Sequence, residues 1–454
     1  MRIIGHLEKY RSRFYIGILC IVILTLTMKG ITDEGVISLQ GDPPRHMMNG
    51  VYFYDLIRDF PLTNPIEYTL QYYARYPALS LGFHPPLLGI AEVPFYTVFG
   101  VSVFSARLTI VFFMVLAGIM WFLLIRGIYD ENVAFLSSLL FITTPFIVKF
   151  SQVVMTEIPT LALIIVATYF FYKYCELEKI KYAFAFVITF IFSIFSKQIA
   201  IFMLPVFLVY FLVTKGIRKL ITKKMITSCI IITLLILLLI IMTLNFSQHT
   251  ISWVKGYMFS KIELSRIVHS LKFVWHNHLT FPVLALSVIS IAVSINRRNK
   301  HSLFFLLWIT SLYMLITIIR APEPRYAIYW IPAFCLFPAT AVNFFHHRPW
   351  KIILSTLLLI IAGYQFMIAF QRELTYADGY EEAARYVVEN QKGEIVLYSS
   401  KVDSGYFIFF TRKHDPHQDI IVFRADKILA TNKMDHIVEN RINKREEIYE
   451  ILQD

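Results

Sequence analysis

Apolar runs of membrane-spanning length dominate the pattern of hydrophobic and polar positions along this chain. Several of them contain no charged residue, among them 108–125, 279–296 and 352–371. A helix needs about 20 mostly apolar residues to cross the hydrocarbon core of a bilayer, so the pattern predicts an all-α polytopic membrane protein with about eleven transmembrane helices. They are expected at residues 14–31, 104–125, 133–150, 157–172, 182–196, 198–214, 226–245, 280–296, 302–319, 326–343 and 352–370.

The basic residues of the loops give these predicted helices an orientation. "KGIRKLITKK" (215–224), "RRNK" (297–300) and "HHRPWK" (346–351) all fall on the side of the basic N-terminus. Because lysine and arginine are enriched in cytoplasmic loops, we expect a multi-pass protein of the cell membrane with a cytoplasmic N-terminus and an extracytoplasmic C-terminal segment. The first apolar run also has features of a signal peptide, but no small-residue cleavage site follows it, so a retained helix is favoured.

The first external loop, residues 32–103, is rich in aromatic and amphipathic sequence. "HMMNGVYFYDLIRDF" (46–60) and "HPPLLGIAEVPFYTVFG" (84–100) predict short helices that lie in the membrane interface. The second stretch is long enough to form an additional span, an alternative that Glu92 and Pro94 disfavour.

Residues 371–454 have the pattern of a small soluble domain. "GYEEAARYVVEN" predicts a helix, "EIVLYSS" and "DIIVFRA" predict short strands, and "NKREEIYEILQD" predicts a final charged helix. The chain is therefore expected to consist of a transmembrane domain, 1–370, and a small extracytoplasmic α/β domain, 371–454.

Composition and charge agree with a membrane protein and exclude a nucleic-acid binder. Hydrophobic residues make up 57% of the chain and charged residues 16%, against about 25% charged residues in soluble proteins. The net charge of +12 is uneven, because residues 371–454 carry −4 and the remainder carries +16. The excess of basic residues in the membrane domain calls for a topological or a phosphate-binding role. The four cysteines show no spacing typical of zinc or of a disulfide framework.

Charged residues gather at the predicted external ends of the helices. Such residues are costly beside a bilayer and usually functional, although each one alone is also compatible with a solvated helix end. The acidic ones are Asp33, Glu34, Asp42, Glu92, Glu157 and Glu323. The basic ones are Arg45, Arg75, Lys197, Arg320 and Arg325, and His84 precedes two prolines in the same loop.

Opposite charges at one interface suit a substrate that carries a phosphate and a lipid tail. If a sugar is attached through phosphate to a polyprenyl chain, the tail stays in the bilayer and the sugar lies at the interface. A carboxylate can then take the proton of an acceptor hydroxyl that attacks the anomeric carbon. A guanidinium or an ammonium can stabilise the charge that grows on the departing lipid phosphate.

The order of the motifs resembles the membrane glycosyltransferases of the C superfamily, in the branch of the protein O-mannosyltransferases and the lipid A aminoarabinose transferase. The resemblance runs from residue 14 to about residue 340. It rests on the "DE" pair that ends the first helix and on "GDPPRHMMNGVYFYDL", "HPPLLGIAEVPFYTVFGVSVFSARL", "MTEIPTLAL", "SKQ" and "RYAIYWIPAF". It implies glycosyl transfer from a polyprenyl-phosphate donor to a hydroxyl of a cell-envelope glycolipid, polysaccharide or protein.

The resemblance also implies roles for individual residues. Asp33 takes the position of the catalytic base, and Lys197 and Arg325 match positions that face the lipid phosphate. Glu34 is expected to orient or bind the acceptor, because consecutive helical residues do not share a face. Asp42 belongs to the elaborate "GDPPRH" motif and is the alternative base. The resemblance does not assign the remaining members of the site; their polar character and predicted external position assign them to substrate binding: Arg45, His84, Glu92, Glu157 and Arg320.

Other functions are compatible with part of this pattern. A transporter of lipid-linked sugars would show an internal repeat and ionisable residues near the middle of its spans, whereas the charges here lie at span ends. A non-catalytic envelope assembly protein is the other alternative. No cofactor is expected, and "HNH" at 276–278 is too loose for a zinc signature, so a divalent metal is the less favoured hypothesis.

Overall fold

The computed structural model divides the chain into two compact units. Unit 1 comprises Met1–Ile31 and Ile110–Glu373, and unit 2 comprises Thr32–Thr109 and Leu374–Asp454. The predicted first external loop therefore groups with the predicted C-terminal domain, while the assignment of two domains divided at 370 and 371 stays a prediction. The structure describes residues 2–32, 41–61, 63–81, 83–216, 234, 237, 264–297, 300–319, 322–373, 376–391, 393–399, 405–425, 430–432 and 438–440.

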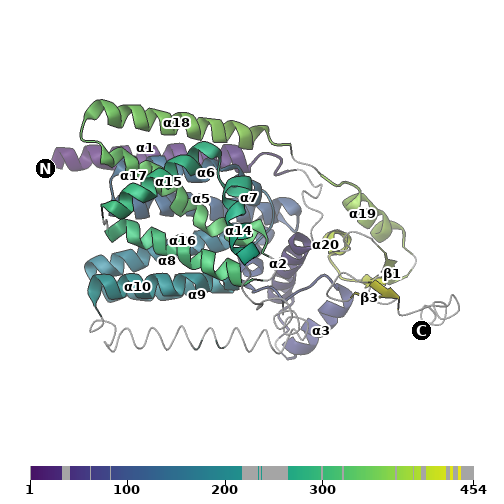
Figure 1. The fold of residues 1–454 in the computed structure, drawn as a ribbon. Coiled ribbons are helices and arrows are strands. Elements are labelled where there is room, and N and C mark those ends of the chain that lie inside the picture. The colour runs from purple at the N-terminus through teal and green to yellow at the C-terminus, as the bar shows by residue number, and fades with distance from the viewer. Residues whose placement is uncertain are drawn as a thin grey trace. The chain divides into compact units, whose positions relative to one another are not determined.

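Unit 1 is a bundle of long apolar helices whose axes run nearly parallel in Figure 1. Neighbouring helices in the sequence pack as pairs, and distant ones such as the first and the last of the bundle also meet. The α-helices are α1 (Arg2–Thr27), α5 (Val103–Ile128, whose residues 103–109 are counted in unit 2), α6 (Glu131–Thr143), α7 (Pro145–Ser151), α8 (Glu157–Leu177), α9 (Ile180–Ser196), α10 (Met203–Lys215), α14 (Leu264–Phe273), α15 (Phe281–Asn296), α16 (Lys300–Ile318), α17 (Ile331–Ala341) and α18 (Arg348–Gln371). Short 3-10 or π turns connect them: η1 (Gln198–Phe202), η3 (Val274–His278), η4 (Pro324–Trp330) and η5 (Val342–Phe344).

The described helices make this a multi-pass membrane protein. Among the described residues, seven helices are long and apolar enough to cross a membrane, or up to eight if one bent pair is a single span. Ten of the eleven predicted spans coincide with helices, although α9 and α15 are shorter than a full span. The predicted span at 226–245 lies outside the described residues, so the count of eleven stays a prediction.

One predicted span, 133–150, is broken in the structure. Helices α6 and α7 meet at an angle of 64° at Thr144. Pro145 has no N–H to continue the helical hydrogen bonds and disfavours a helical conformation in the residue before it. Thr144 accordingly has φ −57° and ψ 121°, and the proline explains the break.

Buried tryptophans hold the turn η4 in place within unit 1. Trp308 donates from Nε1 to the carbonyl of Tyr329 at 2.9 Å, and Trp330 donates to His278 Nδ1 at 2.8 Å. The Nε2 atom of His278 lies 2.9 Å from the carbonyl oxygen of Pro324. A ring that accepts at Nδ1 and donates from Nε2 is neutral, and burial lowers the pKa of His278 to about 3, although the bond to Pro324 opposes this. His278 therefore joins η3 to both ends of η4.

Unit 2 combines the helices of the first external loop with the C-terminal segment. Two loop helices and the C-terminal helix at 380–390 coincide with predictions, whereas α3 and α20 are not predicted from the sequence. The predicted helix at 443–454 lies outside the described residues. The elements are α2 (Asp42–Asp59), α3 (Pro65–Arg75), α4 (Leu87–Phe99), α19 (Tyr380–Asn390), β1 (Ile395–Tyr398), α20 (Gly405–His414), β2 (Ile421–Arg424), β3 (Ala430–Asn432) and β4 (Val438–Asn440).

The strands of unit 2 form two small pairs. Strands β1 and β2 are parallel, with Ile395 opposite Ile421, and β3 and β4 are antiparallel. Helix α20 contacts both α19 and α2. The C-terminal segment thus packs directly on a helix of the first external loop.

A buried ion pair joins α20 to α2. Arg412 donates from Nε to Asp55 Oδ2 at 2.8 Å and from Nη2 to Oδ1 at 2.5 Å, and both residues are almost fully buried. The hydroxyl of Tyr72 on α3 donates to Asp55 Oδ2 at 2.8 Å. Burial alone would lower the pKa of Arg412, but the bonds and charge of Asp55 raise it. These bonds connect α2, α3 and α20. Removing either charged partner would leave the other one buried and unpaired, which is strongly destabilising.

Helices α2 and α4 cross closely because glycines lie at the contact. A Cβ at Gly89 would lie 3.0 Å from the carbonyl carbon of Asn49, and a Cβ at Gly50 would collide with Oε2 of Glu92. Glu92 is fully buried there, and the hydroxyl of Tyr96 donates to its Oε2 at 3.5 Å. Burial raises the pKa of Glu92 well above the usual glutamate value, although Tyr96 opposes this. Burial therefore favours the protonated, uncharged form of this carboxyl group.

Replacing His278 should destabilise the bundle. In His278→Leu, Trp330 Nε1 and the carbonyl of Pro324 lose their partners, and each buried unsatisfied group costs about 1–3 kcal/mol. We expect a lower unfolding temperature of the detergent-solubilised protein. His276→Leu is the matched control, because His276 is exposed in the same turn. Equal unfolding temperatures for the two variants would contradict this role.

Replacing Glu92 with glutamine should stabilise the protein in a pH-dependent way. The unfolded glutamate ionises near pH ~4.3 and the folded one at a higher pH, so the free energy of unfolding of the wild type falls by up to about 1.4 kcal/mol per pH unit between the two pKa values. Glu92→Gln removes this loss. Its gain in unfolding temperature should be large at pH ~8 and shrink toward pH ~4, and parallel curves at every pH would refute the argument. Glu382→Gln, at an exposed position of α19, should show no such gain.

Candidate functional site

Three of the sequence-predicted site residues lie outside the described residues. They are Asp33, Glu34 and Arg320. Their roles stay predictions. Five of the others form two clusters: Glu157, Lys197 and Arg325 in unit 1, and Asp42 and His84 in unit 2.

The cluster in unit 1 begins with a buried ion pair between Glu157 and Lys197. Glu157 lies in the first turn of α8, where the helix dipole favours a carboxylate. Lys197 is an extended residue, with φ −158° and ψ 128°, between the end of α9 and the start of η1. Its Nζ atom lies 2.6 Å from Glu157 Oε1. The side chain of Glu157 is fully buried, while that of Lys197 is 18% exposed.

The turn η4 brings the second predicted cation to the same place. The Nζ atom of Lys197 lies 5.2 Å from the ring centroid of Tyr326, and the guanidinium carbon of Arg325 lies 5.4 Å from that centroid. Arg325 also forms an ion pair with Glu323, with 2.7 Å between Nε and Oε2. Two cations that were predicted separately from "SKQ" and "RYAIYWIPAF" therefore flank one aromatic ring.

This cluster is chemically suited to an oxyanion. The ammonium of Lys197 has three N–H donors, and one of them donates a hydrogen bond to Glu157. A guanidinium has five N–H donors in a planar fork that matches phosphate. Each cation already has a carboxylate partner, so the cluster is close to neutral before a ligand enters and its cations are held in defined positions.

The cluster in unit 2 contains Asp42 and two histidines. His84 Nε2 lies 3.6 Å from Asp42 Oδ1, and the rings of His46 and His84 lie 4.3 Å apart between centroids. Asp42 is the first residue of α2, and Pro43 and Pro44 follow it in the first turn, where proline is tolerated because its missing N–H would have no helical partner. Asp42 and His84 were predicted for different roles, and the fold brings them together.

The remaining described residues of the predicted site, Arg45 and Glu92, lie outside these two clusters. Arg45 lies on α2 and is partly exposed. Glu92 lies buried between α2 and α4, as described above, and its assignment to substrate binding stays a prediction. Among the described residues, no group of three or more His, Cys, Asp or Glu side chains is arranged to hold a metal ion.

Sequence reasoning missed Tyr326 in the first cluster and, elsewhere in unit 2, the buried pair of Asp55 and Arg412. Tyr326 was part of a motif, but nothing in its spacing indicated that it would contact Lys197. Asp55 and Arg412 also went unnoticed, although a signal was present. Each is a charged residue beside aromatic residues, in "FYDLIRDF" and "FFTRKH", and a charge in such surroundings needs a partner when it is buried.

Comparison with known proteins supports the sequence resemblance. The model of the dolichyl-phosphate-mannose-protein mannosyltransferase family matches residues 83–243. No curated protein matches the sequence of the chain.

Solved structures of low sequence identity share the fold. ArnT from Cupriavidus metallidurans in the apo state has a TM-score of 0.66 at 12% identity, over 92% of this chain and 86% of that one. ArnT bound to undecaprenyl phosphate has a TM-score of 0.66 at 13% identity, over 92% and 90%. The oligosaccharyltransferase AglB from Archaeoglobus fulgidus, in complex with an inhibitory peptide and a dolichol-phosphate, has a TM-score of 0.58 at 15% identity, over 85% and 58%. The resemblance of this chain to the membrane glycosyltransferases of the C superfamily is thus confirmed, by a family match over residues 83–243 and by a fold shared over most of its length.

Proposed function

We propose that this protein transfers a sugar from a polyprenyl-phosphate donor to a hydroxyl acceptor of the cell envelope. The observation that carries the proposal is the pair of cations, Lys197 and Arg325, on one Tyr326 ring. Structures with the same fold hold undecaprenyl phosphate or dolichol-phosphate, which supports a donor with a lipid-linked phosphate. The sugar is a hexose or a pentose, and the acceptor is a glycolipid, a polysaccharide or a protein.

In this proposal, Lys197 and Arg325 bind the phosphate that leaves with the lipid. Cleavage of the bond between the anomeric carbon and the phosphate oxygen places a new negative charge on the phosphate. Cations in fixed positions stabilise that charge without having to reorganise during the step. Glu157 fixes Lys197 by the 2.6 Å contact, and Glu323 does the same for Arg325. Both carboxylates act through the cations that they hold.

The proton of the acceptor hydroxyl goes to a carboxylate, for which we propose Asp33. An aspartate with an ordinary pKa near ~4 is ionised at neutral pH and can accept this proton. Glu34 orients or binds the acceptor, and Arg45, His84 and Arg320 contribute to substrate binding. Asp42 is the alternative base, and its 3.6 Å approach to His84 supplies a partner that would orient its carboxylate.

The proposed location follows from the distribution of basic residues. The N-terminus faces the cytoplasm, the chain crosses the cell membrane eleven times, and the clusters described above work on the extracytoplasmic side. The lipid bilayer holds the donor's tail, so only the sugar and phosphate need to reach the protein's polar groups.

Removing the proposed phosphate-binding lysine should reduce transfer. The double variant Lys197→Met with Glu157→Gln avoids leaving a buried carboxylate without a partner. We expect turnover to fall by about 10²-fold or more, because a contact that strengthens in the transition state is lost. Turnover is measured as polyprenyl phosphate released from labelled polyprenyl-phosphate sugar, with membranes of the source cell as acceptor.

The control is a double variant that removes a different ion pair, the one between Lys215 and Glu178, in which Nζ and Oε1 lie 3.1 Å apart. Lys215→Met with Glu178→Gln should leave turnover within about twofold of wild type, since a surface pair of this kind contributes little. Normal kinetics in the folded Lys197 variant would contradict the proposed role. A wild-type protein that moves the labelled lipid across the membrane but leaves the sugar attached would instead be a carrier.

The base can be identified by comparing two aspartates. Asp33→Asn keeps the size of the side chain but removes its capacity to accept a proton, so turnover should fall by about 10²–10⁴-fold while donor binding is kept. Asp42→Asn is the comparison variant. If Asp42→Asn abolishes transfer and Asp33→Asn retains it, the base belongs to the "GDPPRH" motif.

A further inference from the structure

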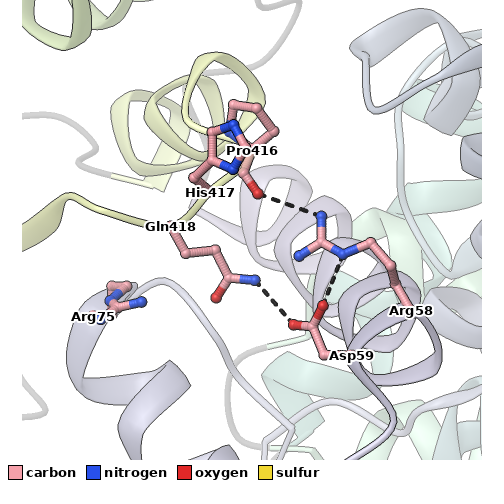
Figure 2. Close-up of a pocket in the computed structure, with 6 residues that line it drawn as sticks. All are labelled: Arg58, Asp59, Arg75, Pro416, His417 and Gln418. Atoms are coloured by element: carbon pink, nitrogen blue, oxygen red, sulfur yellow. Dashed lines mark hydrogen bonds and ion pairs between the residues drawn. The ribbon is translucent and has the colours of Figure 1, made fainter.

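Unit 2 contains an open cavity that the proposed transfer step does not use. It has a volume of about 530 Å³, which lies within the usual range of about 300–1,000 Å³ for ligand pockets. Figure 2 shows the residues that line it: Arg58, Asp59, Arg75, Pro416, His417 and Gln418. Proline is the one apolar residue of this lining, so the cavity is suited to a polar ligand.

Three separate elements build the walls of the cavity. The last turn of α2 supplies Arg58 and Asp59, and the last turn of α3 supplies Arg75. The turn that follows α20 supplies the opposite wall with Pro416, His417 and Gln418 (Figure 2). The first external loop and the C-terminal segment therefore both contribute to it.

The turn after α20 is held in a defined conformation. The carboxylate of Asp415 accepts hydrogen bonds from the backbone N–H groups of Asp419, at 3.1 Å, and Ile420, at 2.8 Å. Arg412, fixed by the buried pair with Asp55, donates to the carbonyl of Asp415 at 3.1 Å. Gln418 has φ 62°, a left-handed conformation that is uncommon for residues other than glycine. Such strain persists where the surroundings determine the conformation, and it is frequent at binding sites.

The charges in the cavity do not cancel. Asp59 accepts from Arg58 Nε at 2.8 Å, from the hydroxyl of Tyr68 at 2.8 Å and from Gln418 Nε2 at 3.2 Å. Burial raises the pKa of Asp59, but these donors and the charge of Arg58 outweigh burial and lower it. Asp59 is therefore ionised and offsets the charge of Arg58. Arg75 has no hydrogen-bond or ion-pair partner among the described residues, and its positive charge is left over.

We propose that this cavity binds a saccharide that carries an oxyanion, a phosphate or a carboxylate. Arg75 faces the oxyanion, and the polar groups of Asp59 and Gln418 bond to hydroxyls. A phospholipid headgroup carries the same oxyanion, but its acyl chains would need an apolar wall beside the cavity. The assignment of this saccharide to the acceptor rests on the proposed glycosyl transfer, whereas the binding itself does not.

Binding can be tested on the full-length protein in phosphatidylcholine nanodiscs, with glucose 6-phosphate as the probe and glucose as the neutral comparison. Ligand-observed NMR titration should show saturable binding of glucose 6-phosphate that is at least about 10-fold tighter than that of glucose. Arg75→Gln should weaken binding of the phosphate probe by about 10-fold or more, because a charge-assisted bond is lost. Arg385→Gln is the matched control, since Arg385 is an exposed arginine on α19 of the same unit, and it should bind like wild type.

A second measurement needs no variant and guards against misfolding of Arg75→Gln. The affinity of the wild-type protein for glucose 6-phosphate should fall steadily as sodium chloride rises from about 50 mM to about 500 mM, because salt screens the arginine charge. Equal binding of glucose and its phosphate, or equal binding by Arg75→Gln and Arg385→Gln, would overturn the proposal. If glucose 6-phosphate no longer binds when the nanodiscs contain phosphatidylglycerol, the cavity binds a lipid headgroup instead. The assay contains no donor, so its result is independent of whether the protein transfers sugar.

Discussion

The cost of removing a charge from water governs how this chain is organised. Burying an ion costs several kcal/mol of hydration free energy, unless a partner of opposite charge or a change of protonation compensates for this cost. Glu157 is paired with Lys197, and Asp55 is paired with Arg412. Glu92 has no cation beside it in the described structure, and burial raises its pKa, which favours the neutral form. Each arrangement constrains the packing around the buried group, because losing its partner would leave a buried charge or polar group uncompensated.

The sequence predicted much of the helical fold because an apolar run is a local property. Length and composition alone locate α5, α16 and α18, and the amphipathic stretches of the first loop locate α2 and α4. The break between α6 and α7 had a visible cause in Pro145, but its angle depends on the neighbouring helices. Helix α20 was missed because its sequence, "GYFIFFTRKH", has no clear helical periodicity and is stabilised by contacts with α2 and α19.

The candidate site was less predictable, because it depends on residues that are far apart in the sequence. Motifs identified Lys197 and Arg325 separately, and only the fold brings both to Tyr326. Asp55 and Arg412 are separated by 357 positions, and no pattern in one segment indicates its partner in the other. Arg75 was noted as a basic residue of the external side, whereas the cavity around it requires the turn after α20. Charge type can thus be read from a sequence, but charge pairing requires the structure.

The pairing of the cations also has a consequence for the proposed reaction. A donor phosphodiester carries one negative charge, whereas the released phosphate monoester carries about −1.5 to −2 at neutral pH. Attraction to Lys197 and Arg325 therefore grows as the bond breaks, which is the condition for accelerating the step rather than merely binding the donor. Glu157 and Glu323 offset the cations before the reaction and so limit their attraction to the singly charged donor. As the phosphate gains charge, it competes better with these carboxylates for the same N–H groups. The ion pairs thereby direct the electrostatic stabilisation toward the leaving group.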